Sequence, residues 1–324
     1  MARPKILLTC RWPEAVERRL AERYDVSLSP DDRPLNAEAL GRALQDHDAL
    51  CPTVSDVIDA AVLEQARGGR AKIIGNYGVG VNHIDLKAAA ELGLVVTNTP
   101  GVLTEATAEL AVLLMLMAAR RAGEGERELR SGRWTGWRPT HNVGTQVTGA
   151  TLGLIGFGRI AQQVACTAHH GLGMRILYNS RHRAPVETEA ETGAVYHPDL
   201  DTLMPEADFV SLHCPGGPET FHLIGERRLG LMKPSAFLIN TARGPVVDEA
   251  ALTVALKTRR IAGAGLDVYE AEPKVTPGLL ELENVVLSPH LGSATEQSRT
   301  AMGMKVADNL DVFFDGGEPP DRVT

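Results

Sequence analysis

The chain has 324 residues, 44% of them hydrophobic and 23% charged, which is the composition of a soluble globular protein with about two domains. Its 33 basic and 41 acidic residues leave a net charge of −8, and this balance argues against nucleic-acid binding, which needs a basic face. The four cysteines contain no Cys-x-x-Cys pair, so neither a metal site nor a disulfide framework is expected.

Nothing in the sequence indicates a membrane protein. Residues 1–8 lack the long apolar stretch of a signal peptide, and the most apolar run, residues 110–119, is far shorter than the roughly 20 residues that span a bilayer. We therefore expect a cytoplasmic protein without membrane contact, whose partners are small molecules and a second copy of the chain.

Strand-like apolar runs alternate with helical patterns over residues 5 to about 100. These runs are residues 5–8, 26–28, 49–51, 72–74 and 95–98. Because each connection between neighbouring parallel strands needs a crossover, usually a helix, the alternation predicts a parallel sheet with helices on both faces. Residues 1–102 are therefore expected to form most of a first α/β domain.

A second alternating region follows a helix expected at residues 104–121. Residues 123–147, rich in Gly, Arg and Trp, fit neither a helical nor a strand pattern. Strand-like runs then recur at residues 152–155, 176–178, 209–212, 236–239, 263–266 and 285–287. Six parallel strands are the number in a full dinucleotide-binding fold. Residues 294–314 read as a long final helix.

The first strand of this second region runs into a Gly-x-Gly-x-x-Ala motif, formed by Gly156, Gly158 and Ala161. Gly156 would allow a tight turn, Gly158 would let the backbone approach a pyrophosphate, and Ala161 would keep helix and strand close. Such glycines also serve ordinary turns. Here a strand precedes the motif, a helix follows it, and a second strand ends about 20 residues later, which favours dinucleotide binding.

Three residues of the second region carry the side chains that reduction of a 2-keto acid requires. Arg243 can bind a keto acid through paired hydrogen bonds, His290 can give a proton to the developing alkoxide, and a carboxylate at Glu272 can stabilise the protonated imidazole. Arg243 and His290 each follow an apolar strand, and the carboxyl ends of parallel strands are where ligands bind in such sheets. The alternatives are a surface arginine and a structural histidine. The residues alone do not separate Glu272 from Glu270.

These motifs, in this order and over nearly the whole chain, resemble the D-isomer-specific 2-hydroxyacid dehydrogenases. Within that family the chain is most similar to glyoxylate/hydroxypyruvate reductases, through residues 132–139, Ser180-Arg181 and residues 289–295. The resemblance implies an α/β fold of two doubly wound parallel-sheet domains. A Rossmann dinucleotide-binding domain (residues 103–293) would include a dimerisation arm (123–147). A flavodoxin-like substrate-binding domain would combine residues 1–102 with 294–324.

The resemblance also assigns site residues. It makes Arg243, Glu272 and His290 catalytic, with the acid before the proline as the partner of the histidine. Substrate binding is implied for Val79, Gly80, Arg243 and His290, and for Trp137 reaching across a symmetric homodimer. Cofactor contacts are implied for Thr107, Gly156, Phe157, Gly158, Arg159, Ile160, Ser180, Arg181, Arg183, Cys214, Pro215, Thr220, Thr241, Ala242, Asp267, Gly292 and Ser293. No metal is implied.

The sequence after the second strand bears on which cofactor is used. Enzymes specific for NAD carry an acid there, which binds the ribose 2′-hydroxyl. This chain has no acid between Tyr178 and Arg183, whereas Arg181 and Arg183 offer two guanidinium groups for a 2′-phosphate. We therefore expect NADP(H) to be preferred, with NAD(H) possible. The alternative is a solvated basic turn.

The function expected from the residues and the resemblance is reduction of glyoxylate or hydroxypyruvate to the D-hydroxy acid by hydride transfer from NADPH, with His290 as proton donor. Other D-2-hydroxyacid, phosphoglycerate or phosphite dehydrogenases remain alternatives, because the three catalytic residues do not choose among these substrates. A phosphoglycerate dehydrogenase is less favoured, since no regulatory domain is expected after residue 324. A dinucleotide-sensing corepressor or scaffold without turnover is an alternative from another class.

Overall fold

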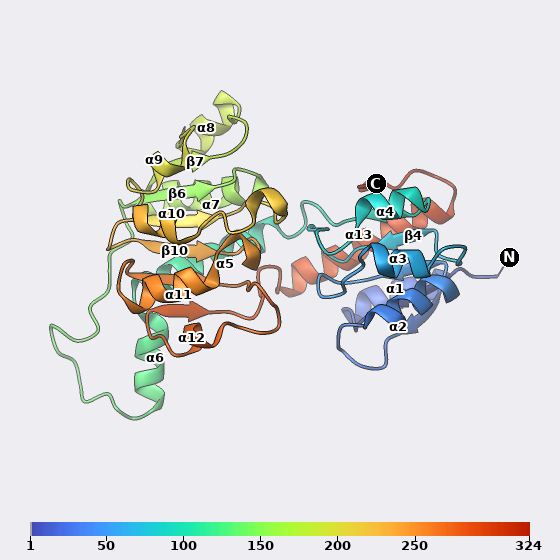
Figure 1. Ribbon diagram of the computed structural model, residues 1–324, viewed down its shortest axis with the longest axis horizontal. Helices are drawn as coiled ribbons and strands as arrows, with labels where there is room; N and C mark the ends of the chain where they lie inside the picture. Colours follow the sequence, from blue (N-terminus) through green and yellow to red (C-terminus); the bar gives the residue numbers. More distant parts are fainter. Residues whose placement is uncertain (1) are drawn as a thin grey trace. The chain divides into compact units, whose positions relative to one another are not determined.

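The computed structural model of the chain describes residues 2–324, which form two compact units (Figure 1). The first unit contains the residues up to Leu103 together with Ala294–Thr324, and the second contains Thr104–Ser293. No helix within residues 2–324 is both long enough and apolar enough to cross a membrane.

The first unit is built on a five-stranded parallel sheet with the strand order β2-β1-β3-β4-β5. This is the flavodoxin-like order of a doubly wound sheet, and its strands occur where the apolar runs predict them. The strands are β1 (Lys5–Leu8), β2 (Asp25–Leu28), β3 (Ala49–Cys51), β4 (Ile73–Gly75) and β5 (Val95–Thr97). The helices are α1 (Glu14–Arg23), α2 (Ala37–Asp46), α3 (Ala60–Gln65), α4 (Leu86–Glu91) and α13 (Glu296–Phe314).

The last helix, α13, belongs to this first unit although it is far from it in sequence. A Cβ atom added to Gly75 of β4 would come within 2.8 Å of Val306, and one added to Gly303 would come within 2.7 Å of Val16 of α1. Both glycines therefore allow the helix to pack closely against the sheet and against α1. Thr295 caps the helix by accepting from the N–H group of Ser298.

The second unit is built on a seven-stranded parallel sheet with the order β12-β11-β10-β9-β6-β7-β8. The strands are β6 (Thr151–Ile155), β7 (Arg175–Asn179), β8 (Ala194–Tyr196), β9 (Phe209–Leu212), β10 (Phe237–Asn240), β11 (Gly263–Leu266) and β12 (Val285–Leu287). Six of them were expected. The unexpected strand is β8, which has three residues and pairs only with β7 at the sheet edge, where Val195 remains 53% exposed. So short and exposed a strand leaves little apolar signal.

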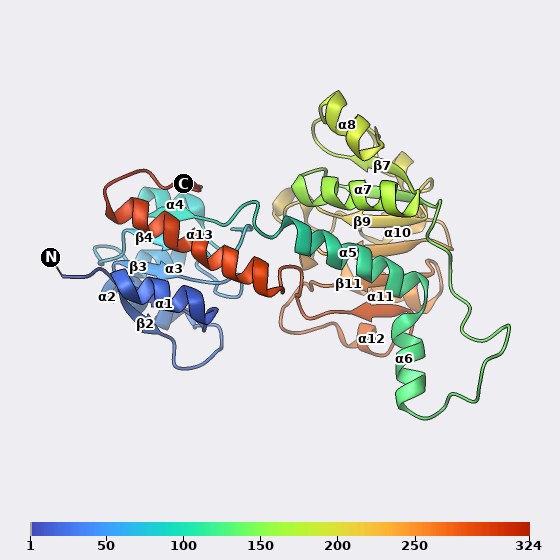
Figure 2. The same cartoon turned by 180° about the vertical axis from the view of Figure 1, so that it is seen from behind.

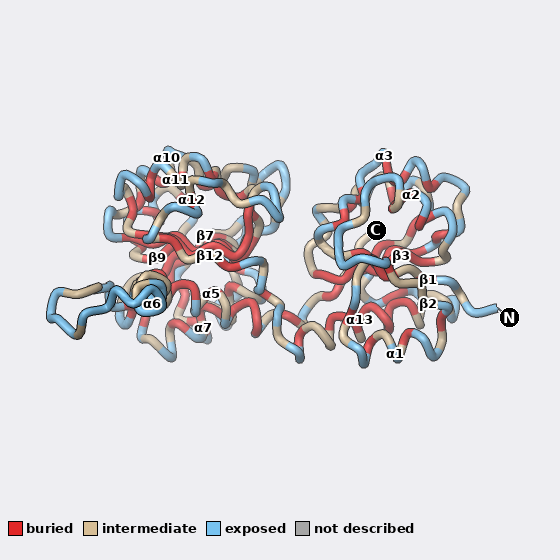
Figure 3. Tube along the Cα trace, turned by 90° about the horizontal axis from the view of Figure 1, so that it is seen from below, coloured by how far each residue is buried: buried red, intermediate tan, exposed pale blue. Residues whose placement is uncertain are grey.

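Helices cover both faces of this second sheet. They are α5 (Thr104–Ala119), α6 (Ala122–Arg130), α7 (Arg159–Leu172), α8 (Val186–Thr192), α9 (Leu200–Leu203), α10 (Glu226–Leu231), α11 (Glu249–Lys257) and α12 (Pro277–Leu280), with the 3-10 helices η1 (Pro218–Thr220) and η2 (Gly244–Val246). Successive side chains of a strand point to opposite faces. Phe237 and Ile239 accordingly pack with α5 and α7 (Figure 2), whereas Leu238 packs with α10 and α11. Inner strands are buried throughout, namely β3 and β4 in the first unit and β9, β10 and β11 in the second, whereas the edge strands β2 and β8 are partly exposed (Figure 3).

The segment 123–147 is only partly irregular, and the expectation of no regular structure there was wrong for its first part. Residues Ala122–Arg130 form α6, which carries ion pairs one turn apart, such as that of Arg130 with Glu126. Gly123 and Gly125 lower the helix propensity and so hid this helix. The chain then continues as a long loop that extends away from the sheet (Figure 2). The expected arm (123–147) is thus divided between α6 and this loop, and from here on the arm means the loop, residues 131–147.

Candidate active site

His290 and Glu272 form a direct pair at the carboxyl edge of the seven-stranded sheet. His290 Nδ1 lies 2.8 Å from Glu272 Oε2, and the other carboxylate oxygen accepts from the N–H group of Tyr269 at 3.0 Å. The side chains are 32% and 33% exposed, so both are accessible while partly shielded from water. With Nδ1 on the carboxylate, Nε2 is the ring nitrogen that can exchange a proton with a substrate.

The Glu272 carboxylate is held in its charged form. Burial alone would raise its pKa, but the hydrogen bond from His290 and the charge of that ring oppose the effect, aided by the N–H group of Tyr269 and by Arg243. The net result is a pKa of Glu272 below its usual value of 4.5. A charged carboxylate at this position stabilises an imidazolium and sets the orientation of its ring.

Glu270, the competing acid of the same loop, has a different set of partners. Its Oε1 accepts from the N–H group of Glu249 at 2.8 Å and lies 3.1 Å from Nε2 of His222. In return, the carboxylate of Glu249 accepts from the N–H group of Glu270. His222 Nδ1 is 3.8 Å from Asp248, so this ring lies between two carboxylates. Glu270 therefore anchors the loop to the start of α11, through contacts between distant residues that leave no signal in the local sequence.

Arg243 follows β10 and lies close to the His290–Glu272 pair. Burial lowers the pKa of Arg243, and the nearby Glu272 carboxylate opposes that shift. A guanidinium remains protonated in either case. Asn240 fixes the backbone here, because its side chain donates to the carbonyl of Arg243 and accepts from the N–H group of Ala242. The structure thus brings Arg243, Glu272 and His290 together from three loops of the second unit.

Asp267, at the end of β11, braces the loop that carries His290. Its two carboxylate oxygens accept from the N–H groups of Leu291 and Gly292 at 2.7 and 2.8 Å. Its backbone carbonyl accepts from the N–H group of His290. Burial raises the pKa of Asp267, whereas the two amides lower it. Thr107 of α5 lies beside the same carboxylate, since a Cβ atom on Gly292 would contact both residues. The Asp267 carboxylate therefore has a structural role in holding residues 290–292, in addition to its expected contact with a cofactor.

The turn between β6 and α7 has the features that a dinucleotide pyrophosphate requires. Gly156 has φ +86°, and a Cβ atom there would lie 2.7 Å from the backbone nitrogen of Cys214. Gly158 faces open space and begins the 14-residue helix α7 without a side-chain cap, so the first-turn N–H groups are available to an anion. The ring of Phe157 stacks on Tyr178 in the core, which leaves its backbone for cofactor contact.

The loop after β7 separates the two arginines expected to bind a 2′-phosphate. Arg183 makes paired hydrogen bonds of 2.9 and 2.8 Å to Glu189, which Tyr178 also contacts, and these bonds lower the pKa of Glu189 to about 2. Arg181 instead points toward the loop after β9, with its side chain 78% exposed. The Ser180 hydroxyl donates to the carbonyl of His182. Arg181 is therefore the more available of the two guanidinium groups.

Two further loops contain the remaining expected cofactor residues of the second unit. After β9, the Thr220 hydroxyl donates to the carbonyl of Pro215 at 2.7 Å and so closes the loop that begins at Cys214. After β10, Thr241 is buried, and its hydroxyl has no hydrogen-bond partner among residues 2–324. A buried hydroxyl without a partner is costly. Its position at a carboxyl strand end fits a site that a ligand completes.

Val79 and Gly80 lie in a loop of the first unit that follows β4. The side chain of Asn76 donates to the carbonyls of Gly78 and Gly80, and that of Asn98 donates to the carbonyl of Val79. Because a trans peptide places its N–H opposite its carbonyl, the N–H groups of Val79 and Gly80 point away from the two asparagines. Backbone N–H groups that converge can bind an anion, and the family resemblance assigns that role to Val79 and Gly80.

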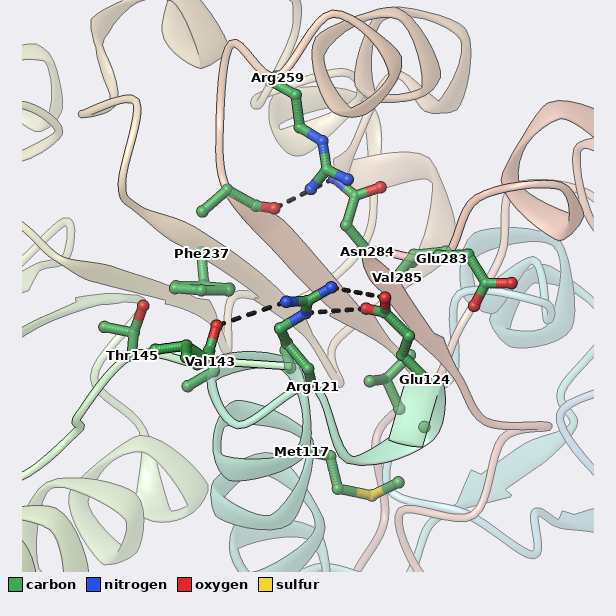
Figure 4. A pocket seen from close by; sticks show the side chains of 16 residues that line it. Met117, Arg121, Glu124, Val143, Thr145, Phe237, Arg259, Glu283, Asn284 and Val285 are labelled. Carbon is green, nitrogen blue, oxygen red and sulfur yellow. Dashed lines mark hydrogen bonds and ion pairs between the residues drawn. The ribbon is translucent and has the colours of Figure 1, made fainter. Parts of the chain in front are cut away.

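A cavity of about 320 Å³ lies apart from these residues, at the amino ends of β10 and β12 (Figure 4). Its wall includes Arg121, which is paired with Glu124 and reaches the carbonyl of Val143 on the arm. The catalytic candidates and the glycine turn are at the carboxyl ends of the strands, where ligands of open α/β sheets bind. We therefore place the candidate active site there and not in this cavity.

Comparisons with known proteins agree with this architecture. The sequence pattern of the family described as "D-isomer specific 2-hydroxyacid dehydrogenase, NAD binding domain" matches residues 112–292. A glyoxylate reductase of Thermococcus onnurineus is 47% identical over 325 residues, covering 99% of this chain and 96% of that protein. A glyoxylate reductase of Pyrococcus furiosus is 45% identical, with 99% and 95% covered.

A solved structure extends the likeness to three dimensions. It is that of an NADPH-dependent glyoxylate/hydroxypyruvate reductase from Sinorhizobium meliloti in complex with NADP and malonate. The TM-score is 0.88 at 34% identity, with 100% of this chain and 97% of that chain covered.

Proposed function

Because this chain belongs to the D-isomer-specific 2-hydroxyacid dehydrogenase family, and is thus a nicotinamide-dependent oxidoreductase, we propose that it reduces glyoxylate and hydroxypyruvate with NADPH. The observation that carries the proposal is the 2.8 Å pair of His290 Nδ1 and Glu272 Oε2 beside Arg243. An acid, its charged partner and a guanidinium at one edge of the sheet are the groups that reduction of a 2-keto acid needs.

The residues of the chain have separate tasks in this reaction. When bound, the reduced nicotinamide supplies a hydride to the keto carbon. His290 gives its Nε2 proton to the keto oxygen, while Glu272 stabilises the imidazolium from the Nδ1 side. Arg243 binds and orients the keto acid through its planar donors. Val79 and Gly80 have the N–H groups for a carboxylate, and this role remains a prediction.

The proposed preference for NADPH depends on the loop after β7. It has no acid between Tyr178 and Arg183 that would accept from a ribose 2′-hydroxyl. Arg181 provides an exposed guanidinium, and a phosphate with two acceptor oxygens suits such a donor. The NADPH-dependent relative from Sinorhizobium meliloti supports this preference.

We also propose that the enzyme is a symmetric homodimer that forms through α6 and the arm. Apolar side chains are exposed along this stretch, where Leu129 is 61%, Trp134 50%, Trp137 81% and Val143 64% exposed. So many exposed large side chains on one segment are typical of an interface, and tryptophan is a frequent anchor. Trp137 would border the active site of the second copy.

A cofactor-oxidation assay tests the proposal. Purified protein should oxidise NADPH in the presence of glyoxylate or hydroxypyruvate, and kcat/KM should be higher with these acids than with pyruvate, each measured with NADPH and with NADH. Oxidation of phosphite or phosphoglycerate in the reverse direction, without reduction of glyoxylate, would contradict the proposed substrate. Tight cofactor binding without turnover of any acid would favour a sensing role instead.

A further inference from the structure

Arg181 and Glu219 form an ion pair between the two loops that flank the glycine turn. Arg181 follows β7 and Glu219 lies in η1, after β9, while β6, which ends in the glycine turn, lies between these two strands. Arg181 Nη1 is 3.6 Å from Glu219 Oε2. The two side chains are 78% and 82% exposed, and so exposed a pair contributes little to the stability of the fold.

We propose that Glu219 sets the preference between NADPH and NADH by competing with the ribose 2′-phosphate for Arg181. The inference rests on the proposed reductase function, in which the adenosine ribose lies at the end of β7. A phosphate that binds Arg181 must approach within a few ångströms of the Glu219 carboxylate or displace it. Since such a phosphate carries roughly two negative charges at neutral pH, it competes with the Glu219 carboxylate for the one guanidinium of Arg181.

The loop around Glu219 does not need this carboxylate for its shape. The hydroxyl of Thr220 donates to the carbonyl of Pro215, and the backbone N–H group of Thr220 donates to the carbonyl of Gly217. Arg181 is the only ion-pair partner of Glu219 among residues 2–324. Removal of the charge should therefore leave the loop intact and act on ligand binding alone.

Arg181 is also the guanidinium on which such competition can act. Arg183 is held by Glu189 through two hydrogen bonds, and Tyr178 reinforces that carboxylate. The loose, single contact of Arg181 is weaker and can be exchanged for a phosphate. NADH carries an uncharged hydroxyl at the same position, so Glu219 should matter little for it.

Binding titrations separate these effects without turnover. Dissociation constants for NADPH and NADH, and for the fragments 2′,5′-ADP and 5′-AMP, would be measured with the wild-type protein and with Glu219→Gln. We expect NADPH and 2′,5′-ADP to bind about three- to tenfold more tightly to the variant, while NADH and 5′-AMP change less than twofold. High salt should shrink the gain, because exposed charges are screened.

Two variants serve as controls. Glu281→Gln removes the same charge from an exposed residue beside β12, at the opposite edge of the sheet, and should change no dissociation constant. In an Arg181→Ala background, Glu219→Gln should lose most of its effect, because the contested group is gone. All variants should unfold at the wild-type temperature.

Several results would overturn the inference. These are unchanged NADPH binding in Glu219→Gln, an equal gain for NADPH and NADH, or an undiminished gain in the Arg181→Ala background. The proposed cofactor preference is judged separately, from the wild-type ratio of the two dissociation constants. A wild-type protein that binds NADH more tightly would contradict that preference, whereas a selective gain for NADPH in Glu219→Gln would still support the role of Glu219.

Discussion

His290 has its backbone in the left-handed region, with φ +54°. Outside glycine this conformation costs on the order of 1 kcal/mol and persists only where neighbours hold it. Asp267 supplies that support, because its carbonyl and both carboxylate oxygens accept the N–H groups of residues 290–292. The imidazole is thereby directed to Glu272 before any ligand binds. Such preorganisation is what a proton donor requires.

Replacement of His290 by alanine should therefore affect chemistry much more than binding. We expect kcat of His290→Ala to fall by about 10²–10⁴-fold, the range for loss of a general acid, while the NADPH dissociation constant stays within about twofold. Steady-state kinetics and a binding titration measure the two quantities. His170→Ala, on the exposed end of α7, is the matched control and should be fully active. Near wild-type turnover in His290→Ala would remove this residue from the mechanism.

Glu272 and Glu270 should differ in their effect on the pH profile. The pKa of Glu272 is held below 4.5, so its carboxylate is charged throughout the neutral range and loses its charge only as the pH falls through that lowered value. In Glu272→Gln an uncharged amide takes the place of this carboxylate, so the charge that stabilises an imidazolium is missing at every pH. The wild-type kcat should fall at acid pH as Glu272 loses its charge, whereas kcat of Glu272→Gln should be low throughout and lack this acid limb.

Glu270→Gln is the comparison for this prediction. Glu270 contacts His222 and the start of α11, not His290. The Glu270→Gln variant should be less stable than the wild-type protein and should keep the wild-type acid limb of kcat. Profiles of kcat against pH for both variants decide the assignment, and loss of the acid limb in Glu270→Gln alone would reverse it.

At the scale of elements, the site depends on how closely two loops at the carboxyl ends of β10 and β11 approach. Gly244 follows Arg243, and a Cβ atom on it would lie 1.8 Å from the backbone carbon of Tyr269. The contact is with backbone, which cannot rotate away. This glycine therefore allows the loop of Arg243 to lie against the loop that carries Glu272.

Gly244→Ala should separate these loops. We expect a loss of at least about 2 kcal/mol in the free energy of unfolding, because backbone overlap exceeds ordinary overpacking, together with a large fall in kcat. Denaturant unfolding and steady-state assays measure both. Gly171→Ala on α7, where an added Cβ meets nothing within 4 Å, should instead be neutral or stabilise by up to about 1 kcal/mol. Equal stability of the two variants would contradict the proposed contact.

At the scale of the whole molecule, the arm presents large apolar side chains that its own chain leaves exposed. Trp137 is 81% exposed, so its ring is not packed within its own arm. Other exposed apolar side chains lie on the same stretch of chain. The cavity lined by Arg121 and Val143 lies beside it. These features are consistent with a surface that a second copy covers.

Light scattering should accordingly give twice the mass of one chain. If Trp137 borders the active site of the second copy, Trp137→Ala should raise KM for hydroxypyruvate more than for the smaller glyoxylate, with kcat little changed. Trp134→Ala, in the same arm, is the matched control for a general effect on assembly. A monomeric wild-type protein, or equal changes in KM for both acids, would contradict the proposal.

The pattern of apolar runs was sufficient to predict the five strands of the first sheet and six of the seven strands of the second, because buried parallel strands are apolar on both faces. The glycine motif and the order of the catalytic motifs likewise predicted the family, which the comparisons confirm. The edge strand β8 and the helix α6 were missed. One is too short and exposed to leave an apolar signal, and the other contains two glycines.

The tertiary structure decided what depends on contacts between distant segments. Glu270 and Glu272 are two residues apart and chemically alike, and only the position of His290 and His222 in space distinguishes their partners. In the same way, Glu189 engages Arg183, and Glu219 approaches Arg181 from another loop. Local periodicity reports which residues are buried, but side-chain pairing depends on which strand ends the sheet order places side by side.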